Sequence, residues 1–246
     1  MHVRLVNANT TPAMTRAVEA AARAVAGPLT TVDAVTPRTG PASVESHYEE
    51  ALAVPGLLER VAEGEREGVD GWVVACFGDP GVDAARELAA GPVLGIAEAA
   101  FHAATMVSRR FGVVTTLGRT TGRAWDLVRR HGHGEACTEV RACDVPVLEL
   151  DDPASEARRR VTAECRAVLA GGADAVVLGC AGLADLCHDL TTELGAPVVD
   201  GVAAATTFVE SLVALRLTTS TRGEYAPPPA KRMTGLLAPF ERVSPP

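Results

Sequence analysis

One strand-like segment of this chain occurs twice. Residues 68–76 read Gly-Val-Asp-Gly-Trp-Val-Val-Ala-Cys, and residues 172–180 read Gly-Ala-Asp-Ala-Val-Val-Leu-Gly-Cys. A short, continuous apolar run bounded by turn residues is typical of a parallel strand that is buried on both faces. In an open α/β sheet, ligands bind beyond the carboxyl ends of the strands. The repeat therefore predicts two cysteines, Cys76 and Cys180, at equivalent places beside one ligand site.

Strand-like and helix-like patterns alternate along the whole chain, which favours a parallel α/β architecture. We expect strands at 2–6, 30–35, 70–75, 92–95, 111–115, 138–142, 174–179 and 197–199. We expect helices at about 11–26, 46–67, 82–90, 98–109, 119–131, 154–170, 183–194 and 202–217. Proline marks the first turn of two of these helices, in Thr11-Pro12 and in Asp152-Pro153.

The internal repetition extends beyond the cysteine strands. The run Gly-Pro-Val-Leu-Gly-Ile-Ala at 91–97 is similar to the run at 195–203, and the first strand is roughly similar to the fifth. The sequence therefore predicts two pseudo-symmetric α/β domains, each a four-stranded parallel sheet flanked by helices, with the active site in the cleft between them. We expect residues 1–97 plus 202–223 in the first domain and 98–201 in the second, because the last helix would pack back on the first half.

Residues 224–246 differ in composition from the rest of the chain. They hold six of the sixteen prolines, including Pro227, Pro228 and Pro229. We expect this proline-rich C-terminal tail to be irregular and to lie over the surface or over a neighbouring subunit.

Charge and hydropathy exclude several classes of partner. The net charge is −8, which argues against a nucleic acid or an anionic membrane surface. No apolar stretch approaches the length of a membrane span. The chain begins with the strand-like run Val3–Val6 and shows no signal-peptide pattern, so we expect a cytoplasmic protein.

Six cysteines are present, and their spacing contains no Cys-x-x-Cys pair. A structural zinc site on these cysteines is therefore not expected, nor is the disulfide framework of a short secreted chain. Outside the repeat, a cysteine is most simply a small buried hydrophobe. We expect that role for the four others, Cys137, Cys143, Cys165 and Cys187.

The two repeated cysteines are suited to proton transfer. Small residues and a predicted helix follow each of them, and the N–H groups at a helix N-terminus lower the pKa of a nearby thiol. One thiolate and one thiol on opposite sides of a carbon acid would form a general base and a general acid. The alternative is that both are core residues whose equivalence reflects duplication alone.

Six stretches of the chain resemble the hydantoin racemase family, which includes allantoin racemases, within the aspartate/glutamate racemase superfamily. These stretches are Val6–Thr11, Ala75–Gly81, Gly95–Ala99, Phe111–Thr116, Leu178–Gly182 and Val198–Gly201. One departure is Asn7-Ala-Asn9, where the family usually has Asn-Pro-Asn; it keeps Asn9, the more plausible ligand-facing residue.

The resemblance implies a cofactor-independent racemase in which Cys76 and Cys180 are the two bases. Family enzymes epimerise the carbon between the ring nitrogen and the carbonyl of 5-monosubstituted hydantoins. The partner would be a small-molecule cyclic ureide, and no metal, pyridoxal phosphate or nicotinamide is expected because the ring carbonyl stabilises the carbanion. Family members commonly form homo-oligomers, which we expect here too.

Residues near the cysteines indicate how a substrate would be held. Amino-acid racemases of the superfamily typically follow the cysteine with Asn or Thr, whereas here Cys76-Phe-Gly and Cys180-Ala-Gly favour a neutral ring. The candidate substrate-binding residues are Asn9, Phe77, Gly78, Asp79, Thr115, Thr116, Ala181 and Gly182. For Asn9 and the threonines the alternative is strand-end capping, and for Asp79 it is capping of the helix that starts near Pro80.

Other polar residues carry weaker signals. Glu98 and Asp200 follow the fourth strand of each half and are expected to fix loops or support the site from behind. The loop 40–46 is a candidate cover for the 5-substituent, although we expect its Ser43 to cap the next helix. Simple roles are expected for the rest: solvated or packed imidazoles for His47, His102 and His188, a solvated face for 158–160, and core positions for Trp72 and Trp125.

Other functions stay open at this point. A racemase of aspartate or glutamate, or a decarboxylase or cis–trans isomerase on the same fold, are the enzyme alternatives, and the decarboxylases typically need only one cysteine. A non-enzymatic binding protein is the third. The choice between hydantoin and allantoin depends on the shape of the pocket.

Overall fold

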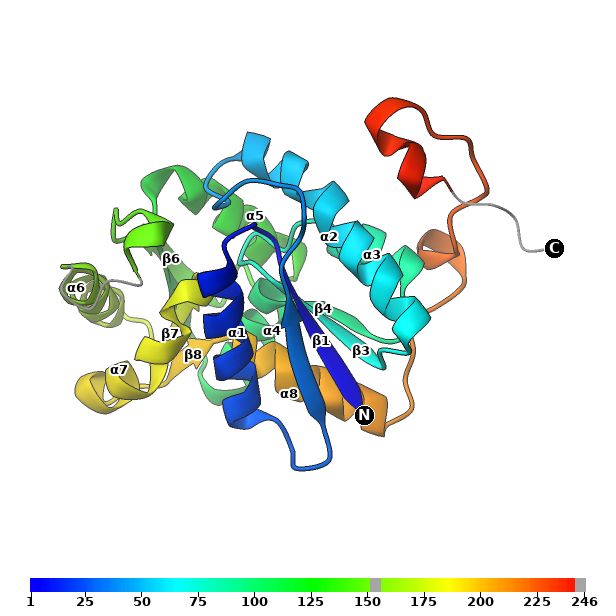
Figure 1. The fold of residues 1–246 in the computed structure, drawn as a ribbon. Helices are drawn as coiled ribbons and strands as arrows, with labels where there is room; N and C mark the ends of the chain where they lie inside the picture. Colours follow the sequence, from blue (N-terminus) through cyan, green and yellow to red (C-terminus); the bar gives the residue numbers. More distant parts are fainter. Residues whose placement is uncertain (151–155, 242–246) are drawn as a thin grey trace.

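The computed structural model describes residues 1–150 and 156–241. It contains two four-stranded parallel sheets, with strand orders β2-β1-β3-β4 and β6-β5-β7-β8 (Figure 1). The first sheet comprises β1 (His2–Asn7), β2 (Thr31–Val35), β3 (Gly71–Ala75) and β4 (Val93–Gly95). The second comprises β5 (Phe111–Thr115), β6 (Cys137–Ala142), β7 (Ala175–Gly179) and β8 (Val198–Asp200). The predicted fold class is confirmed.

Helices connect the strands in both halves. Those of the first half are α1 (Pro12–Val25), α2 (His47–Glu67), α3 (Val82–Leu88) and α4 (Ile96–Val107). Those of the second half are α5 (Thr121–Arg130), α6 (Ala157–Ala170), α7 (Cys187–Leu194) and α8 (Gly201–Ala214). Short 3-10 helices are η1 (Gly118–Thr120), η2 (Val147–Glu149), η3 (Ala181–Leu186), η4 (Gly223–Tyr225) and η5 (Gly235–Phe240). The helix expected over 183–194 is therefore a 3-10 helix at its start, and the expected helix start at Asp152-Pro153 lies outside the described residues.

The first and third strands of each half pair in equivalent registers. Asn7 at the end of β1 lies opposite Ala75 of β3, and Thr115 at the end of β5 lies opposite Gly179 of β7. Each repeated cysteine follows directly after its strand. The register therefore brings a polar first-strand end beside a cysteine in each half.

The main core lies between the two sheets. Helices α4 and α8 pack against each other there, and α8 also contacts α1 and β3 of the first half. Phe101 of α4 is fully buried and stacks on Phe111 of β5, with 5.8 Å between the ring centroids. The predicted core position of Trp72 is confirmed, although it lies in a separate core cluster of the first half, and Trp125 is partly buried against the main core.

Residues 215–241, which follow α8, are irregular apart from η4 and η5, and their later part extends away from the two sheets (Figure 1). Tyr225 fastens their earlier part, because the phenol donates to Asp83 Oδ1 at 3.1 Å. Leu236, further along, is 97% exposed. Among the described residues, no helix has both the length and the apolarity needed to cross a bilayer.

Candidate active site

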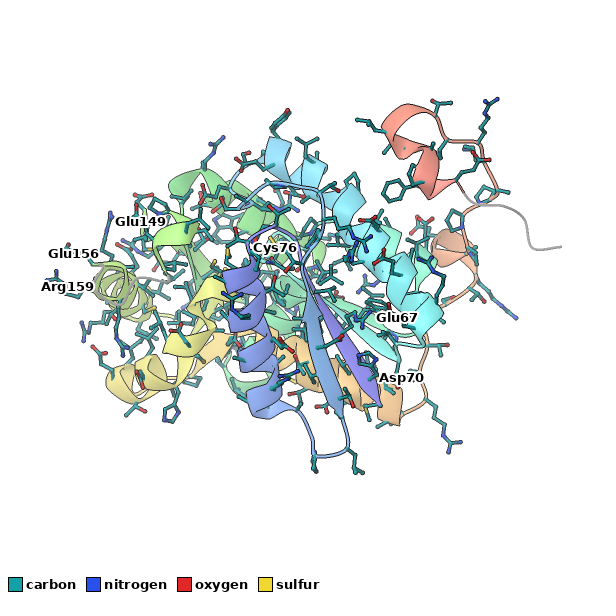
Figure 2. The ribbon with its side chains drawn as sticks, in the orientation of Figure 1. Glu67, Asp70, Cys76, Glu149, Glu156 and Arg159 are labelled. Atoms are coloured by element: carbon teal, nitrogen blue, oxygen red, sulfur yellow. The ribbon has the colours of Figure 1, made fainter. Side chains whose placement is uncertain are left out.

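A cavity of about 190 Å³ lies between the two halves, and both Cys76 and Cys180 line it. Figure 2 shows Cys76 near the middle of the molecule. None of the six cysteines forms a disulfide. The fold thus brings the two repeated thiols to one cavity, as the duplicated strand predicted.

The two cysteines sit in different turns. Cys180 is the N-cap residue of η3, and its carbonyl accepts a hydrogen bond from Leu183 N at 3.1 Å. Cys76 is followed by a longer turn in which Asp79 N donates to the Cys76 carbonyl at 2.9 Å, and α3 starts only at Val82. Helix α3 therefore starts at Val82, where the sequence predicted it, whereas η3 starts directly after Cys180.

Burial dominates the acidity of Cys76. Loss of solvation raises the pKa of its thiol to about 12, and the neighbouring Cys180 and Asp79 also raise it, while a hydrogen bond from the Gly78 backbone lowers it. The sequence predicted a lowered pKa; that prediction is wrong for Cys76 because one amide does not compensate for burial of the sulfur. Cys76 is therefore a protonated thiol at neutral pH.

Asn9 lines the cavity from the β1–α1 loop. Its side-chain oxygen accepts from Asn7 Nδ2 and from Thr11 N, both at 3.0 Å, which fixes the loop. Its amide nitrogen lies 3.4 Å from Met14 Sδ, a weak acceptor. That nitrogen can therefore donate to a carbonyl placed in the cavity.

The two threonines of the fifth strand end divide into different roles. Thr115 donates to the Gly179 carbonyl at 3.2 Å, which is the strand-end capping considered as its alternative. Thr116 also lines the cavity, and among the described residues its hydroxyl has no hydrogen-bond partner. Thr116 is thus the threonine available to a ligand.

Phe77, Gly78 and Ala181 also line the cavity, whereas Asp79 and Gly182 are not among its lining residues. The Asp79 carboxylate accepts from Ala97 N at 3.0 Å and from Glu98 N at 2.9 Å, so it caps α4. Neither reading considered for Asp79 is therefore observed, because its carboxylate caps α4 instead of the helix near Pro80 and does not line the cavity. Burial raises the pKa of Asp79 to about 7.

Arg123 of α5 is a lining residue that the sequence did not single out. Its Nε donates to the Gly78 carbonyl at 3.1 Å, Nη2 contacts the same oxygen, and Nη1 pairs with Glu50 of α2. The side chain therefore links α5 of the second half to two parts of the first half, the turn after Cys76 and helix α2. No local pattern reveals this role, because Arg123 is distant in sequence from both partners.

The β2–α2 loop closes one side of the cavity, as proposed for residues 40–46. Glu45 Oε1 accepts from Val147 N of the second half at 2.9 Å, which fastens the loop across the cleft. Ser46, not Ser43, caps α2, accepting from Glu49 N at 3.2 Å. The pattern Ser-x-x-Glu at 46–49 is a capping box and was the signal for the correct residue.

Two basic side chains stand at the cavity rim. His47 and Arg119 are both exposed, and both contribute to the lining. Within the described part of the chain, neither has a hydrogen-bond or ion-pair partner. They are therefore available to a polar substituent of a ligand.

The remaining candidates support the structure away from the cavity. Asp200 caps α8, accepting from Val202 N at 3.0 Å and Ala203 N at 2.8 Å. Glu98 pairs with Arg86 at 2.7 Å. The predicted exposure of residues 158–160 is confirmed. Cys137, Cys143 and Cys165 are buried as predicted, whereas Cys187 is only partly buried.

Comparison with known proteins gives consistent matches over nearly the whole chain. The model of the family described as Asp/Glu/Hydantoin racemase matches residues 3–209. A hydantoin racemase of Rhizobium meliloti is 44% identical over 96% of this chain and 98% of its own.

Two solved structures are similar in both sequence and fold. Allantoin racemase from Klebsiella pneumoniae is 49% identical, with a TM-score of 0.96 over 99% of this chain and 100% of that one. Allantoin racemase from Pseudomonas fluorescens is 37% identical, with a TM-score of 0.91 over 96% and 100%.

Proposed function

Because the chain belongs to the Asp/Glu/Hydantoin racemase family and is a racemase, an isomerase, we propose that it inverts C5 of 5-monosubstituted hydantoins. We assign the two proton transfers to Cys76 and Cys180. The observation that carries this proposal is that both thiols line one cavity at equivalent strand ends. A two-base inversion needs a proton acceptor on one face of the carbon and a proton donor on the other.

The proposed step moves one proton in each direction. A thiolate at one cysteine takes the proton from C5, the electron pair passes to the adjacent ring carbonyl, and the other thiol returns a proton to the opposite face. Burial raises the pKa of the Cys76 thiol to about 12, so Cys76 is the proton donor in the step that we propose for the described state. The cysteines exchange roles for the opposite enantiomer.

The cavity offers donors for the negative charge that develops on the ring oxygen. Thr116 and Asn9 line the cavity, and we propose that Thr116 Oγ1 and Asn9 Nδ2 donate to a ring carbonyl. Donors that are already oriented stabilise an enolate without reorganisation. The substrate's own carbonyl accepts the electron pair, so the proposal uses no cofactor.

We propose allantoin as the preferred substrate. Its polar ureido substituent needs hydrogen-bond partners, and His47 and Arg119 are exposed at the rim without protein partners among the described residues. The 49% identity to an allantoin racemase supports the same choice. The second candidate is a hydantoin with an apolar substituent, favoured by the carbon-rich wall formed by Met14, Val44 and Val147.

The test follows loss of optical rotation and deuterium uptake at C5 in D2O, for allantoin and for L-5-benzylhydantoin. A sample without enzyme corrects for spontaneous exchange. Faster turnover of allantoin, with Arg119→Met raising KM for allantoin more than for benzylhydantoin, supports the proposal. Failure to racemise or exchange either compound would remove it and turn attention to amino-acid substrates.

Homo-oligomeric assembly is a prediction from the family resemblance, and a cytoplasmic location is a prediction from the sequence. Sedimentation equilibrium of the purified protein would test the first. Cell fractionation would test the second.

A further inference from the structure

A group of side chains outside the cavity has the composition of a transition-metal site. One donor atom from each of Glu98, His102 and His131 lies within 4.8 Å of the others. We propose that these three residues bind a divalent ion of the zinc class at the junction of α4 and α5. Imidazole nitrogen and carboxylate oxygen are ligands that Zn²⁺ prefers.

Two helices bring the donors together. Glu98 and His102 are four residues apart on α4 and therefore lie on one face of that helix. His131 is the C-cap residue of α5 and presents Nδ1 3.9 Å from Glu98 Oε1. Zinc–ligand bonds of about 2.0–2.2 Å would draw these donors together by about 1 Å, a movement that side-chain rotation can supply.

His133 supports the same arrangement from outside it. Its Nε2 lies 3.3 Å from Nδ1 of His102, within hydrogen-bond distance. Imidazole ligands of metals commonly hydrogen-bond through their second ring nitrogen, which fixes the ring and the tautomer. With Nδ1 of His102 engaged by His133, Nε2 of His102 is the atom left for the ion.

The surrounding charges are compatible with a cation. Arg86 occupies only one Glu98 oxygen, Oε2, at 2.7 Å, and leaves Oε1 directed toward His131. The carboxylate of Asp83 pairs with Arg130, which reduces the positive charge near the cluster.

No histidine of this cluster, taken alone, indicates a metal site in the sequence. His102 was expected to be solvated or packed, and the absence of a Cys-x-x-Cys pair argued against zinc on the cysteines alone. The local signal was Glu98-x-x-x-His102 together with His131-x-His133. It is weak until the fold places the end of α5 against α4.

Any test must exclude the cavity thiols, because zinc also binds thiolates. Calorimetric titration with ZnCl2 should therefore use the Cys76→Ser/Cys180→Ser protein. We expect one equivalent of zinc to bind, and His102→Ala and His131→Ala on that background each to weaken binding at least tenfold. His188→Ala, an exposed histidine on α7, is the matched control and should bind as the parent does.

Two outcomes would overturn the proposal. One is loss of all zinc binding in the double serine protein, which would place the ion on the thiols. The other is unchanged affinity in both histidine variants. Binding is measured in a protein without the proposed proton-transfer groups, so the result is independent of whether the proposed racemisation is correct.

A second measurement serves if His131→Ala fails to fold. Cobalt(II) added to the double serine protein should give ligand-field absorption without a thiolate charge-transfer band, and His102→Ala and His131→Gln should abolish it. A cobalt spectrum that persists in both variants would contradict the site. The melting temperature should rise with zinc in the parent and in His188→Ala only.

Discussion

Helices α4 and α8 begin at equivalent strand ends but obtain their N-terminal caps differently. Asp200 ends β8 and caps α8 with its own carboxylate, whereas the equivalent residue at the end of β4 is Gly95. Asp79 caps α4 instead, and a Cβ at Gly95 would lie 2.1 Å from Asp79 Cγ. A carboxylate thus caps the helix in both halves, but in the first half it belongs to Asp79, in the turn after Cys76, and not to the residue that ends the strand.

This exchange makes the two cysteine turns unequal. The Cys76 turn is joined to α4 through Asp79 and to α5 through Arg123. Cys180 instead starts η3 directly. The two positions that we propose for proton transfer therefore have different supports, and perturbing each half separately tests whether they act differently.

The largest effect is expected from the cysteines themselves. Cys76→Ser and Cys180→Ser should each lower racemisation by about 10²–10⁴-fold, because each removes one proton-transfer group. Each variant should still exchange C5–H of one enantiomer with D2O, a different one for each variant, as followed by NMR. Cys187→Ser, outside the cavity, is the control. Full racemisation by either cavity variant would disprove the two-thiol mechanism.

Arg123→Met should lower kcat by about 10²-fold with a smaller change in KM, because the Gly78 carbonyl loses the donor that positions the Cys76 turn. The kcat of Arg123→Lys should lie between those of wild type and Arg123→Met, because an ammonium group cannot reproduce the planar contact of the guanidinium. Steady-state polarimetry measures both constants. Arg129→Met, at an exposed position on the same helix, should leave kcat and KM unchanged. An equal loss of kcat in Arg129→Met would show a general effect on α5.

The raised pKa of Cys76 predicts a pH dependence. In Cys180→Ser the remaining base is Cys76, whose thiolate is scarce below its pKa of about 12. Its C5–H exchange rate should therefore rise about tenfold for each pH unit between pH 7 and 9. Deuterium uptake corrected for spontaneous exchange measures this slope. A plateau near pH 7 would mean that the thiol is far more acidic than its burial indicates.

Gly95→Ala should destabilise the protein by about 1–3 kcal/mol, because the added methyl meets the Asp79 carboxylate. The double change Gly95→Asp/Asp79→Gly, which copies the second half, should recover part of that loss. Urea unfolding gives the free energies. Gly122→Ala in α5 has open space around it and should not destabilise. Equal stability of Gly95→Ala and wild type would contradict the cap exchange.

The final prediction concerns the ionisation of Asp79. Its pKa rises from 3.8 to about 7 on folding, so the folded state holds the proton more tightly than the unfolded state. That contribution to stability is complete below about pH 4 and is lost as the pH rises through 7. Relative to Asp79→Asn, wild type should therefore lose stability between pH 4 and 7 in unfolding titrations. A parallel pH dependence of the two proteins would contradict the raised pKa.

Most of the fold could be predicted from local patterns. Apolar runs ending in turn residues located the strands, and the repeat of the Cys76 segment at Cys180 predicted both the duplication and the shared cavity. The same patterns gave two wrong details. Ser46, and not Ser43, caps α2, and a 3-10 helix precedes the α-helix after Cys180. Local patterns therefore located the strands and helices, but they did not fix the capping residue or the type of the first helical turn.

The sequence by itself determined the two parallel sheets, the positions of the two thiols and the family, because strand periodicity and motif order are properties of the linear chain. Tertiary structure alone decided that Arg123 holds the Gly78 carbonyl, that Asp79 caps α4 and that His131 meets Glu98. It also reversed the expected acidity of Cys76. These outcomes depend on burial and on contacts between residues distant in sequence, which are established only when the two halves pack together.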